Sequence, residues 1–199
     1  ISHDLRTPLT RLRLEAELGV TDEAARQAVV IDIEQMEAVI SQFMDYARTN
    51  FGEDPVTTDL NDLLAAIAER QAQLGRTLAF AASALPTLAV RPRALNRAIG
   101  NLIDNARKYG GGEISLAASV HPKEIWIDVR DHGPGIPENE AERLKRPFTR
   151  LDSARSNASG TGLGLAIVER IARLHDGHLE LLPNTGGGLL ARVVIPLRG

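Results

Sequence analysis

Apolar residues recur at intervals of three and four along the first quarter of the chain, and this rhythm restricts that region to amphipathic helices. The two series are Leu5, Leu9, Leu12 and Ala16, then, after GVTDEAARQ, Val29, Ile33, Met36, Ile40, Phe43 and Ala47. We predict two helices joined by a short turn, in which Gly19 ends the first helix and Thr21 or Asp22 caps the second. Two helices cannot bury both apolar stripes by themselves. We therefore expect two copies to form a four-helix bundle; packing on the rest of the same chain is the alternative.

The helical rhythm stops at NFGEDP, where Gly52 and Pro55 are typical of a linker. Beyond it, some stretches have the apolar spacing of helices and others that of strands. We predict strands near Val56, Leu78 and Leu88 and at 114–120, 124–130, 179–182 and 189–195, with helices at about 61–73, 94–109 and 162–175. This order favours an α+β chain that ends in an α/β sandwich with a mixed sheet. The predicted division is 1–51 for the hairpin, 52–58 for the linker and 59–199 for the second domain.

Composition limits the classes of function. The 199 residues are 43% hydrophobic, enough for a real core, and contain no apolar run of about 18 residues. We expect neither a membrane span nor an export signal, and because His3 lies so near the start, we expect a fragment whose first helix has lost its upstream part. Zero cysteines exclude disulfides and thiolate metal sites. A net charge of -3 argues against a nucleic-acid surface but permits a phosphate ligand held by backbone N–H groups and a metal ion.

The stretch NLIDNARKYG places two amides on one face of a predicted helix. Asn101 and Asn105 are four residues apart, which separates them by about 6 Å, and Lys108 lies on the same side. Carboxamide oxygens, waters and phosphates together suit Mg²⁺, and a nearby lysine neutralises phosphate charge. The alternative for these residues is a polar face turned to solvent.

The stretch DHGPGIP follows an apolar strand. Gly133 and Gly135 permit a tight backbone turn, and the carboxylate of Asp131 could accept the exocyclic amine of an adenine. The alternative is a simple Asp–Gly turn between two elements.

The stretch GTGLGLAIV places Gly160, Gly162 and Gly164 directly before an amphipathic helix. Such glycines let the backbone approach a ligand, and a helix N-terminus attracts phosphate oxygens. Leu165 stands where a dinucleotide fingerprint requires glycine, and no Gly-Lys-Ser/Thr of a Walker loop follows. A flexible loop is the alternative.

Between the two glycine segments lies KRPFTRLDSARSNASG, whose small and polar end is typical of a loop that closes over a ligand. Phe148 could anchor this loop, and Arg150 or Arg155 could reach a terminal phosphate. Core packing of Phe148 and solvated arginines are the alternatives.

The order of these motifs resembles the N, G1, F and G2 boxes of sensor histidine kinases of two-component systems, and the opening HDLRTPL resembles their H box. The resemblance covers essentially the whole chain. The stretches SHDLRTPLTRLRL and DSAR...GTGLGLAIV are most similar in sequence to the osmosensor branch typified by EnvZ. It implies a dimerisation and phosphoacceptor hairpin, a four-helix bundle in the dimer, followed by a Bergerat-type (GHKL) ATP-binding α/β sandwich.

The resemblance also implies roles for individual residues near the nucleotide. Asn105 is the expected Mg²⁺ ligand, with Asn101 and Lys108 assisting and Tyr109 near the nucleotide. Asp131 is expected to receive the adenine amine. The implied ATP-binding set is Asn101, Asn105, Lys108, Tyr109, Asp131, Gly133, Gly135, Arg150, Gly160, Thr161, Gly162, Leu163 and Gly164.

The expected catalytic residues are His3, Asp4 and Thr7. A neutral imidazole is a competent nucleophile, and an unperturbed histidine pKa of about 6.5 leaves most of the side chain unprotonated at neutral pH. Asp4 is placed to hold the other ring nitrogen and to stabilise the growing positive charge. Thr7 lies one turn beyond His3, where its hydroxyl could position a water; the resemblance implies this phosphatase role. Pro8 removes a helical hydrogen bond, so we expect a local bend.

The other histidines are His121, His132, His175 and His178. They show no ligand spacing with acids or with one another, and we predict surface or loop positions for all four. His132 departs from the family pattern, which favours small or polar residues at this position.

The resemblance implies autophosphorylation of His3 with ATP and Mg²⁺, transfer to an aspartate of a response-regulator receiver domain, and dephosphorylation of that regulator. It also implies a homodimer in the cytoplasm, attached to a bacterial inner membrane only through segments absent from this chain. The net charge predicts no nucleic-acid partner. One alternative is a nucleotide-binding signalling scaffold without catalysis. Another is a gyrase-like or chaperone-like ATPase, which needs a glutamate in the asparagine helix; that helix carries Asp104 and no Glu.

Overall fold

The computed structural model describes residues 2–19, 21–48, 52–81, 83–151 and 161–197. The chain divides into two compact units. The first comprises the residues up to Arg48 together with 159–161, and the second comprises the remainder. We describe each unit separately.

The first unit is a helical hairpin formed by α1 (Ser2–Gly19) and α2 (Glu23–Arg48). The carboxylate of Asp22 accepts the N–H groups of Ala24 at 2.9 Å and Ala25 at 3.4 Å, which confirms Asp22 as a cap of the second helix. Among the described side chains, Leu9, Ala16 and Ile33 are buried. Large apolar side chains remain exposed on both helices: Leu12, Leu14, Leu18, Val29, Ile31, Met36, Val39 and Phe43.

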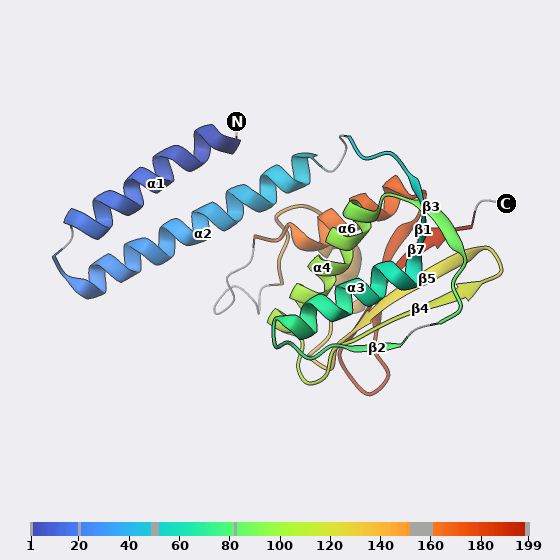
Figure 1. Cartoon of the computed structure of the whole chain (residues 1–199). Helices are drawn as coiled ribbons and strands as arrows, with labels where there is room; N and C mark the ends of the chain where they lie inside the picture. The colour runs from blue at the N-terminus through green and yellow to red at the C-terminus, as the bar shows by residue number, and fades with distance from the viewer. Residues whose placement is uncertain (1, 20, 49–51, 82, 152–160, 198–199) are drawn as a thin grey trace. The chain divides into compact units, whose positions relative to one another are not determined.

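The second unit is a two-layer sandwich in which helices cover one face of a five-stranded sheet (Figure 1). The strands, in spatial order, are β2 (Ala79–Ala81), β4 (Ser115–His121), β5 (Glu124–Arg130), β7 (Leu189–Pro196) and β6 (His178–Pro183). Among these five described strands only β2 and β4 pair in parallel, so the sheet is mixed, as predicted. The long helices are α3 (Leu60–Gln73), α4 (Pro92–Tyr109) and α6 (Gly164–Leu174).

Three smaller features complete the second unit. A separate antiparallel ribbon joins β1 (Val56–Asp59) to β3 (Thr87–Val90). A 3-10 turn, η1 (Glu138–Glu140), leads into the short α5 (Ala141–Leu144). These last two elements lie in a stretch for which the sequence predicts no regular structure.

Alternation along the strands decides which face of the sheet meets the helices. On β5 the buried aliphatic residues Ile125, Ile127 and Val129 alternate with Trp126, Asp128 and charged ends, as a sheet packed by helices on one side requires. The helices contribute residues of matching character to this core. The largest buried side chains from α4 and α6 are Leu95, Ile99, Leu102, Ile103, Ile167 and Ile171.

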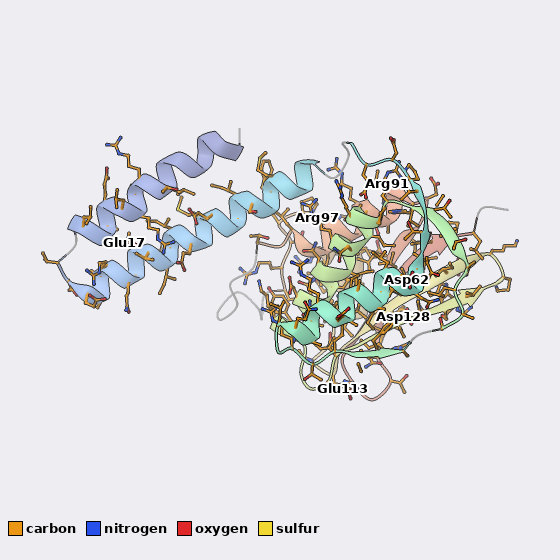
Figure 2. All side chains as sticks on the ribbon, in the orientation of Figure 1. Glu17, Asp62, Arg91, Arg97, Glu113 and Asp128 are labelled. Atoms are coloured by element: carbon orange, nitrogen blue, oxygen red, sulfur yellow. The ribbon has the colours of Figure 1, made fainter. Side chains whose placement is uncertain are left out.

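The opposite face of the sheet carries a polar cluster around the chain's tryptophan. Arg192 binds both carboxylate oxygens of Asp128, at 2.8 and 3.0 Å, and its guanidinium lies 3.7 Å from the centre of the Trp126 ring. His121 stacks on the same ring at 3.5 Å. Figure 2 labels Asp128, which is 4% exposed and satisfied by Arg192 and Arg130. The arginine pairs compensate a buried carboxylate.

The predicted elements are confirmed to within a few residues. The helix predicted at 94–109 begins at Pro92, because proline suits the first turn, and the helix predicted at 162–175 begins at Gly164. One side-chain prediction is wrong: His175 is only 7% exposed, since it ends α6 against the start of α4. No helix in the described ranges has the length and apolar character needed to cross a bilayer.

Candidate nucleotide site

Helices α4 and α6 run antiparallel, which brings the paired asparagines to the start of α6. A Cβ atom added at Gly164 would lie 3.4 Å from Asn105 Oδ1 and 3.7 Å from Asn101 Oδ1. Asn101 Nδ2 donates to the carbonyl of Arg97 at 3.0 Å, which leaves its Oδ1 on the side of Gly164. Two amide oxygens and a helix N-terminus therefore meet at one place, although they are about 60 residues apart in sequence.

The carboxylate of Asp131 is held rigidly just after β5. Asp131 is 6% exposed, and its Oδ1 accepts the N–H groups of Gly133 at 2.9 Å and Leu189 at 3.2 Å. Its backbone carbonyl accepts Asn184 Nδ2 at 2.8 Å. Within the described residues no group donates to Oδ2 of Asp131. One oxygen is thus fixed by the protein, and the other can accept a hydrogen bond from a ligand amine.

The end of α4 packs against the DHGPG motif without room for side chains. A Cβ at Gly133 would lie 2.5 Å from the Cα of Gly110 and 2.7 Å from the carbonyl of Tyr109. His132 adds two links between the same segments: its N–H donates to Gly111 O at 3.0 Å, and its Nδ1 lies 3.0 Å from Glu113 O. His132 therefore fits beside the intact glycines of this motif.

The turn between β6 and β7 supports Asp131 from the other side. Gly188 has a φ of +98°, and a Cβ there would lie 2.0 Å from the carbonyl oxygen of Asp131. Gly135 has a φ of +72°, and a Cβ added there would lie 2.9 Å from the carbonyl oxygen of Gly188. A side chain at either position would clash at these distances, and both dihedral angles favour glycine.

Comparison with known proteins identifies this arrangement. Residues 90–199 match the family of histidine kinase-, DNA gyrase B- and HSP90-like ATPases, and residues 1–52 match the His Kinase A (phospho-acceptor) domain. The chain belongs to the sensor histidine kinases.

Curated relatives of this kinase share more than a third of its residues. Over 100% of the chain it is 38% identical to the sensor histidine kinase GtrS of Pseudomonas aeruginosa, covering 41% of that protein. Over 99% of the chain it is 34% identical to CpxA of Escherichia coli, covering 46% of that protein. The kinase therefore spans less than half the length of these relatives.

Solved structures share the fold. Full-length ShkA in complex with AMPPNP has a TM-score of 0.74 and 25% identity, covering 100% of this chain and 45% of that one. The kinase domain of the E. coli osmosensor EnvZ has a TM-score of 0.58 and 36% identity, covering 75% of this chain and 93% of that one. The family prediction is confirmed. Because the identities to EnvZ and to GtrS are similar, the osmosensor branch stays a prediction.

In the part that the structure describes, the segment predicted to close over the ligand contacts the glycine stretch before α6. Gly162 has a φ of +71° and lies against the backbone of Phe148 and Thr149. A Cβ added at Gly162 would lie 2.9 Å from the backbone nitrogen of Thr149. Phe148 is 61% exposed and has a φ of +61°, so core packing of its ring, the alternative weighed above, is wrong. A bulky residue held in this dihedral region is strained, and such strain is concentrated at functional sites.

The remaining predicted ATP-binding residues divide into three groups. Lys108 and Tyr109 are exposed on the last turn of α4, and Arg150 is partly buried. The side chain of Leu163 is fully buried, so only its backbone can face a ligand. Thr161 precedes it and is partly buried. Gly160 and Arg155 lie outside the described residues.

The predicted catalytic residues of the kinase all fall on the first two turns of α1. The described structure gives their helical backbone within Ser2–Gly19, which sets His3 and Thr7 about one turn apart. The side chains of His3, Asp4, Thr7 and Pro8 lie outside the described ones.

Three residues of the site were not predicted from sequence. Gly110, Asn184 and Gly188 all pack against or bind Asp131. The run NTGGG signals a turn between strands, but nothing local says that this turn lies beside a carboxylate more than 50 residues earlier.

Proposed function

We propose that the kinase binds ATP in its second unit and transfers the γ-phosphoryl group to His3, from which an aspartate of a response-regulator receiver domain receives it. One observation carries the proposal: the amides of Asn101 and Asn105 meet the glycine start of α6 in a chain whose first 52 residues match a phosphoacceptor domain. The same unit supplies a rigid carboxylate at Asp131.

In the proposed complex, Asp131 Oδ2 accepts the adenine amine, which is the complementary donor. Backbone N–H groups at the start of α6 receive phosphate oxygens, because helix N-termini favour anions. Lys108 and Arg150 supply positive charge for the same phosphates. The complete proposed set is Asn101, Asn105, Lys108, Tyr109, Asp131, Gly133, Gly135, Arg150, Gly160, Thr161, Gly162, Leu163 and Gly164.

The donor set near Gly164 fits Mg²⁺. Asn105 is the proposed ligand and Asn101 assists, since both offer amide oxygens on the side of the glycine helix start. Mg²⁺ takes few protein ligands and completes its shell with water and phosphates. When bound, it neutralises charge on the triphosphate.

The proposed chemistry is nucleophilic displacement at the γ-phosphorus. A ring nitrogen of neutral His3 forms the P–N bond while the bond from phosphorus to the β–γ bridging oxygen breaks, and ADP leaves with that electron pair. Asp4 accepts a hydrogen bond from the other ring N–H, fixes the tautomer and stabilises the positive charge that develops. In the reverse regulatory step, the hydroxyl of Thr7 positions water against the phosphorylated regulator.

The proposed organisation is a homodimer in which residues 1–51 form the dimerisation and phosphotransfer hairpin, 52–58 the linker and 59–199 the ATP-binding domain. The exposed apolar stripe of α1 and α2 supports dimerisation, because a bundle with a second hairpin buries it. We place this portion in the cytoplasm of a bacterium, with inner-membrane attachment through segments outside this chain.

Incorporation of ³²P from γ-labelled ATP with Mg²⁺ tests the proposal. We expect label in the wild type, none in His3→Ala, and a loss of at least about 100-fold in Asn105→Ala, since removal of a group that stabilises transition-state charge costs at least this much. His178→Ala and Asn96→Ala are matched controls, because both side chains are exposed and lie outside the proposed site. Label retained in His3→Ala would refute the nucleophile, whereas bound nucleotide without label in the wild type would favour a scaffold.

The dimer is tested first, because the proposed four-helix bundle requires two copies of the hairpin. We expect light scattering to give twice the chain mass of 21.5 kDa, with and without Mg²⁺-ATP. A monomer would show that these two helices do not suffice for assembly.

A further inference from the structure

The first turn of α4 is capped by a residue far away in sequence. The carboxylate of Glu53 accepts the N–H of Arg93 at 2.8 Å through Oε1 and the N–H of Ala94 at 2.9 Å through Oε2. The local cap position, Arg91, makes no side-chain cap of its own. A carboxylate at a helix N-terminus satisfies free donors and complements the helix dipole. Glu53 therefore takes the place of the usual neighbouring cap.

Arg91 ties this contact to the end of α6. Its Nε donates to the backbone carbonyl of Glu53 at 2.8 Å, and its Nη1 donates to the carbonyl of Leu174, the last residue of α6, at 2.8 Å. Arg91 is labelled in Figure 2 at the start of α4. One guanidinium thus joins the linker, α4 and α6.

His175 closes the same contact. Its Nε2 accepts the backbone N–H of Arg91 at 2.9 Å, and its Nδ1 donates to the carbonyl of Ile171 at 2.8 Å, which requires the neutral ring with its proton on Nδ1. Burial lowers the pKa of His175, in keeping with a neutral ring. We call Glu53, Arg91 and His175 the linker clamp.

The linker clamp and the candidate nucleotide site occupy opposite ends of one pair of helices. Because α4 and α6 are antiparallel, the clamp joins the start of α4 to the end of α6, while Asn105 and Gly164 meet at the other end. Position 91 lies 14 residues before Asn105, so about 21 Å of helix separates the two sites. The clamp cannot touch the nucleotide directly.

The clamp shortens the chain that connects the hairpin to the second unit, which we call the ATPase unit. Helix α2 ends at Arg48, and Glu53 is the fifth residue after it, so the chain between them can span at most about 18 Å. Without the clamp, the next fixed pairing is Val56 with Val90, which lengthens the connection to eight residues. Effective concentration falls as roughly the −3/2 power of tether length, which makes this change worth about twofold.

We propose that Glu53 is a positioning residue for autophosphorylation: through the linker clamp it fastens the chain leaving the hairpin to α4 and α6, and so holds His3 within reach of the bound nucleotide. This inference rests on the proposed function. Glu53 itself touches neither nucleotide nor phosphate.

The test compares Glu53→Ala with Asp59→Ala in the whole chain. Asp59 is a matched control because its carboxylate caps α3 locally, accepting Asn61 N–H at 2.8 Å and Asp62 N–H at 3.3 Å, and ties no linker. Both variants lose a helix cap, so each melting temperature should fall by a few degrees. Only Glu53→Ala should lower the initial rate of ³²P incorporation, by about twofold or more, with unchanged affinity for a non-hydrolysable ATP analogue. Glu53→Gln keeps an acceptor and should restore part of the rate.

Hydrogen exchange of the Arg93 and Ala94 amides, which donate to the Glu53 carboxylate, supplies a readout independent of activity. These amides should exchange faster in Glu53→Ala and at the wild-type rate in Asp59→Ala. Equal phosphorylation rates in wild type and Glu53→Ala, or an equal loss in Asp59→Ala, would overturn the positioning role alone. Absence of label in the wild type would overturn the proposed function and the positioning role with it, while unchanged exchange in Glu53→Ala would show that the clamp does not hold the linker.

Discussion

The hairpin and the ATPase unit bury their apolar residues to very different degrees. In the ATPase unit Leu60, Leu95 and Ile99 are 0% exposed, whereas in the hairpin Leu14 is 55% and Leu18 is 79% exposed. In the ATPase unit, α4 and α6 pack on one face of the sheet and close the core within one chain. In the hairpin, the two helices cannot cover their own apolar stripe. The ATPase unit is therefore complete within the chain, and the hairpin needs a further surface.

The largest effect should come from Gly188→Ala, which tests how tightly the ATPase unit packs around Asp131. The new Cβ would stand 2.0 Å from the carbonyl oxygen of Asp131, at a φ of +98°. We expect loss of nucleotide binding and a fall of about 5 kcal/mol in the free energy of unfolding. Gly186→Ala is the control: its φ is +91°, but nothing lies within 4 Å, so only backbone strain of about 1–2 kcal/mol applies. Equal effects of the two variants in binding and denaturation assays would contradict the close packing.

Truncation of one apolar side chain in each region tests the comparison directly. Ile99→Ala should lower the free energy of unfolding of the ATPase unit by about 2–5 kcal/mol, because its buried side chain leaves a cavity. Leu12→Ala removes a side chain that is 49% exposed, so it should cost under about 1 kcal/mol in that assay. Instead, we expect it to raise the dimer dissociation constant in light scattering. An unchanged dissociation constant would place the exposed stripe outside the dimer interface.

Acid should destabilise the ATPase unit through His175. Burial lowers the pKa of this ring in the folded state, so below the ordinary value of 6.5 the unfolded state binds more protons than the folded state. The free energy of unfolding should therefore fall as pH drops below 6.5, by at most about 1.4 kcal/mol per pH unit. Urea denaturation at several pH values measures this slope. His175→Gln, which keeps an acceptor for the Arg91 N–H, should reduce the slope, and His178→Gln should leave it.

The smallest effects come from two ion pairs of the same i, i+4 spacing. Glu15 binds Arg11 at 2.9 Å on the hairpin surface, where both side chains are more than half exposed, so Glu15→Ala should cost under about 0.5 kcal/mol. Glu169 binds Arg173 at 2.7 Å but is 13% exposed, and it also accepts the N–H of Leu179 at 2.9 Å. Glu169→Ala should cost about 1–2 kcal/mol, because it leaves that N–H without its partner. Chemical denaturation compares them; equal costs would show that burial does not separate the two regions.

Much of the fold could be predicted because the signals are local. The three and four spacing from Leu5 to Ala47 and the alternation in β5 each reflect the repeat of one element, and the structure confirms both. The motifs around Asn105, Asp131 and Gly164 could be found as residue types at fixed spacing. Their roles toward ATP stay a prediction until labelled nucleotide is tested.

Other features could not be predicted because they depend on pairing between distant segments. His175 resembles an exposed helix end in sequence, yet it is buried because α4 begins beside it. Phe148 looks like a core residue, yet it is exposed, with its backbone against Gly162. In both cases the sequence shows the type of side chain but not which distant segment packs beside it.

By itself, the sequence determined the helical hairpin, the order of strands and helices in the sandwich, and the family of the chain, since periodicity and motif spacing are properties of consecutive residues. Only the tertiary structure decided that Glu53 caps α4, that Gly188 supports Asp131, and that Gly164 faces the two asparagines. These contacts join residues 40 or more positions apart. Those of Glu53 and Gly164 depend on where α4 and α6 pack, and that of Gly188 depends on the pairing of β5 with β7.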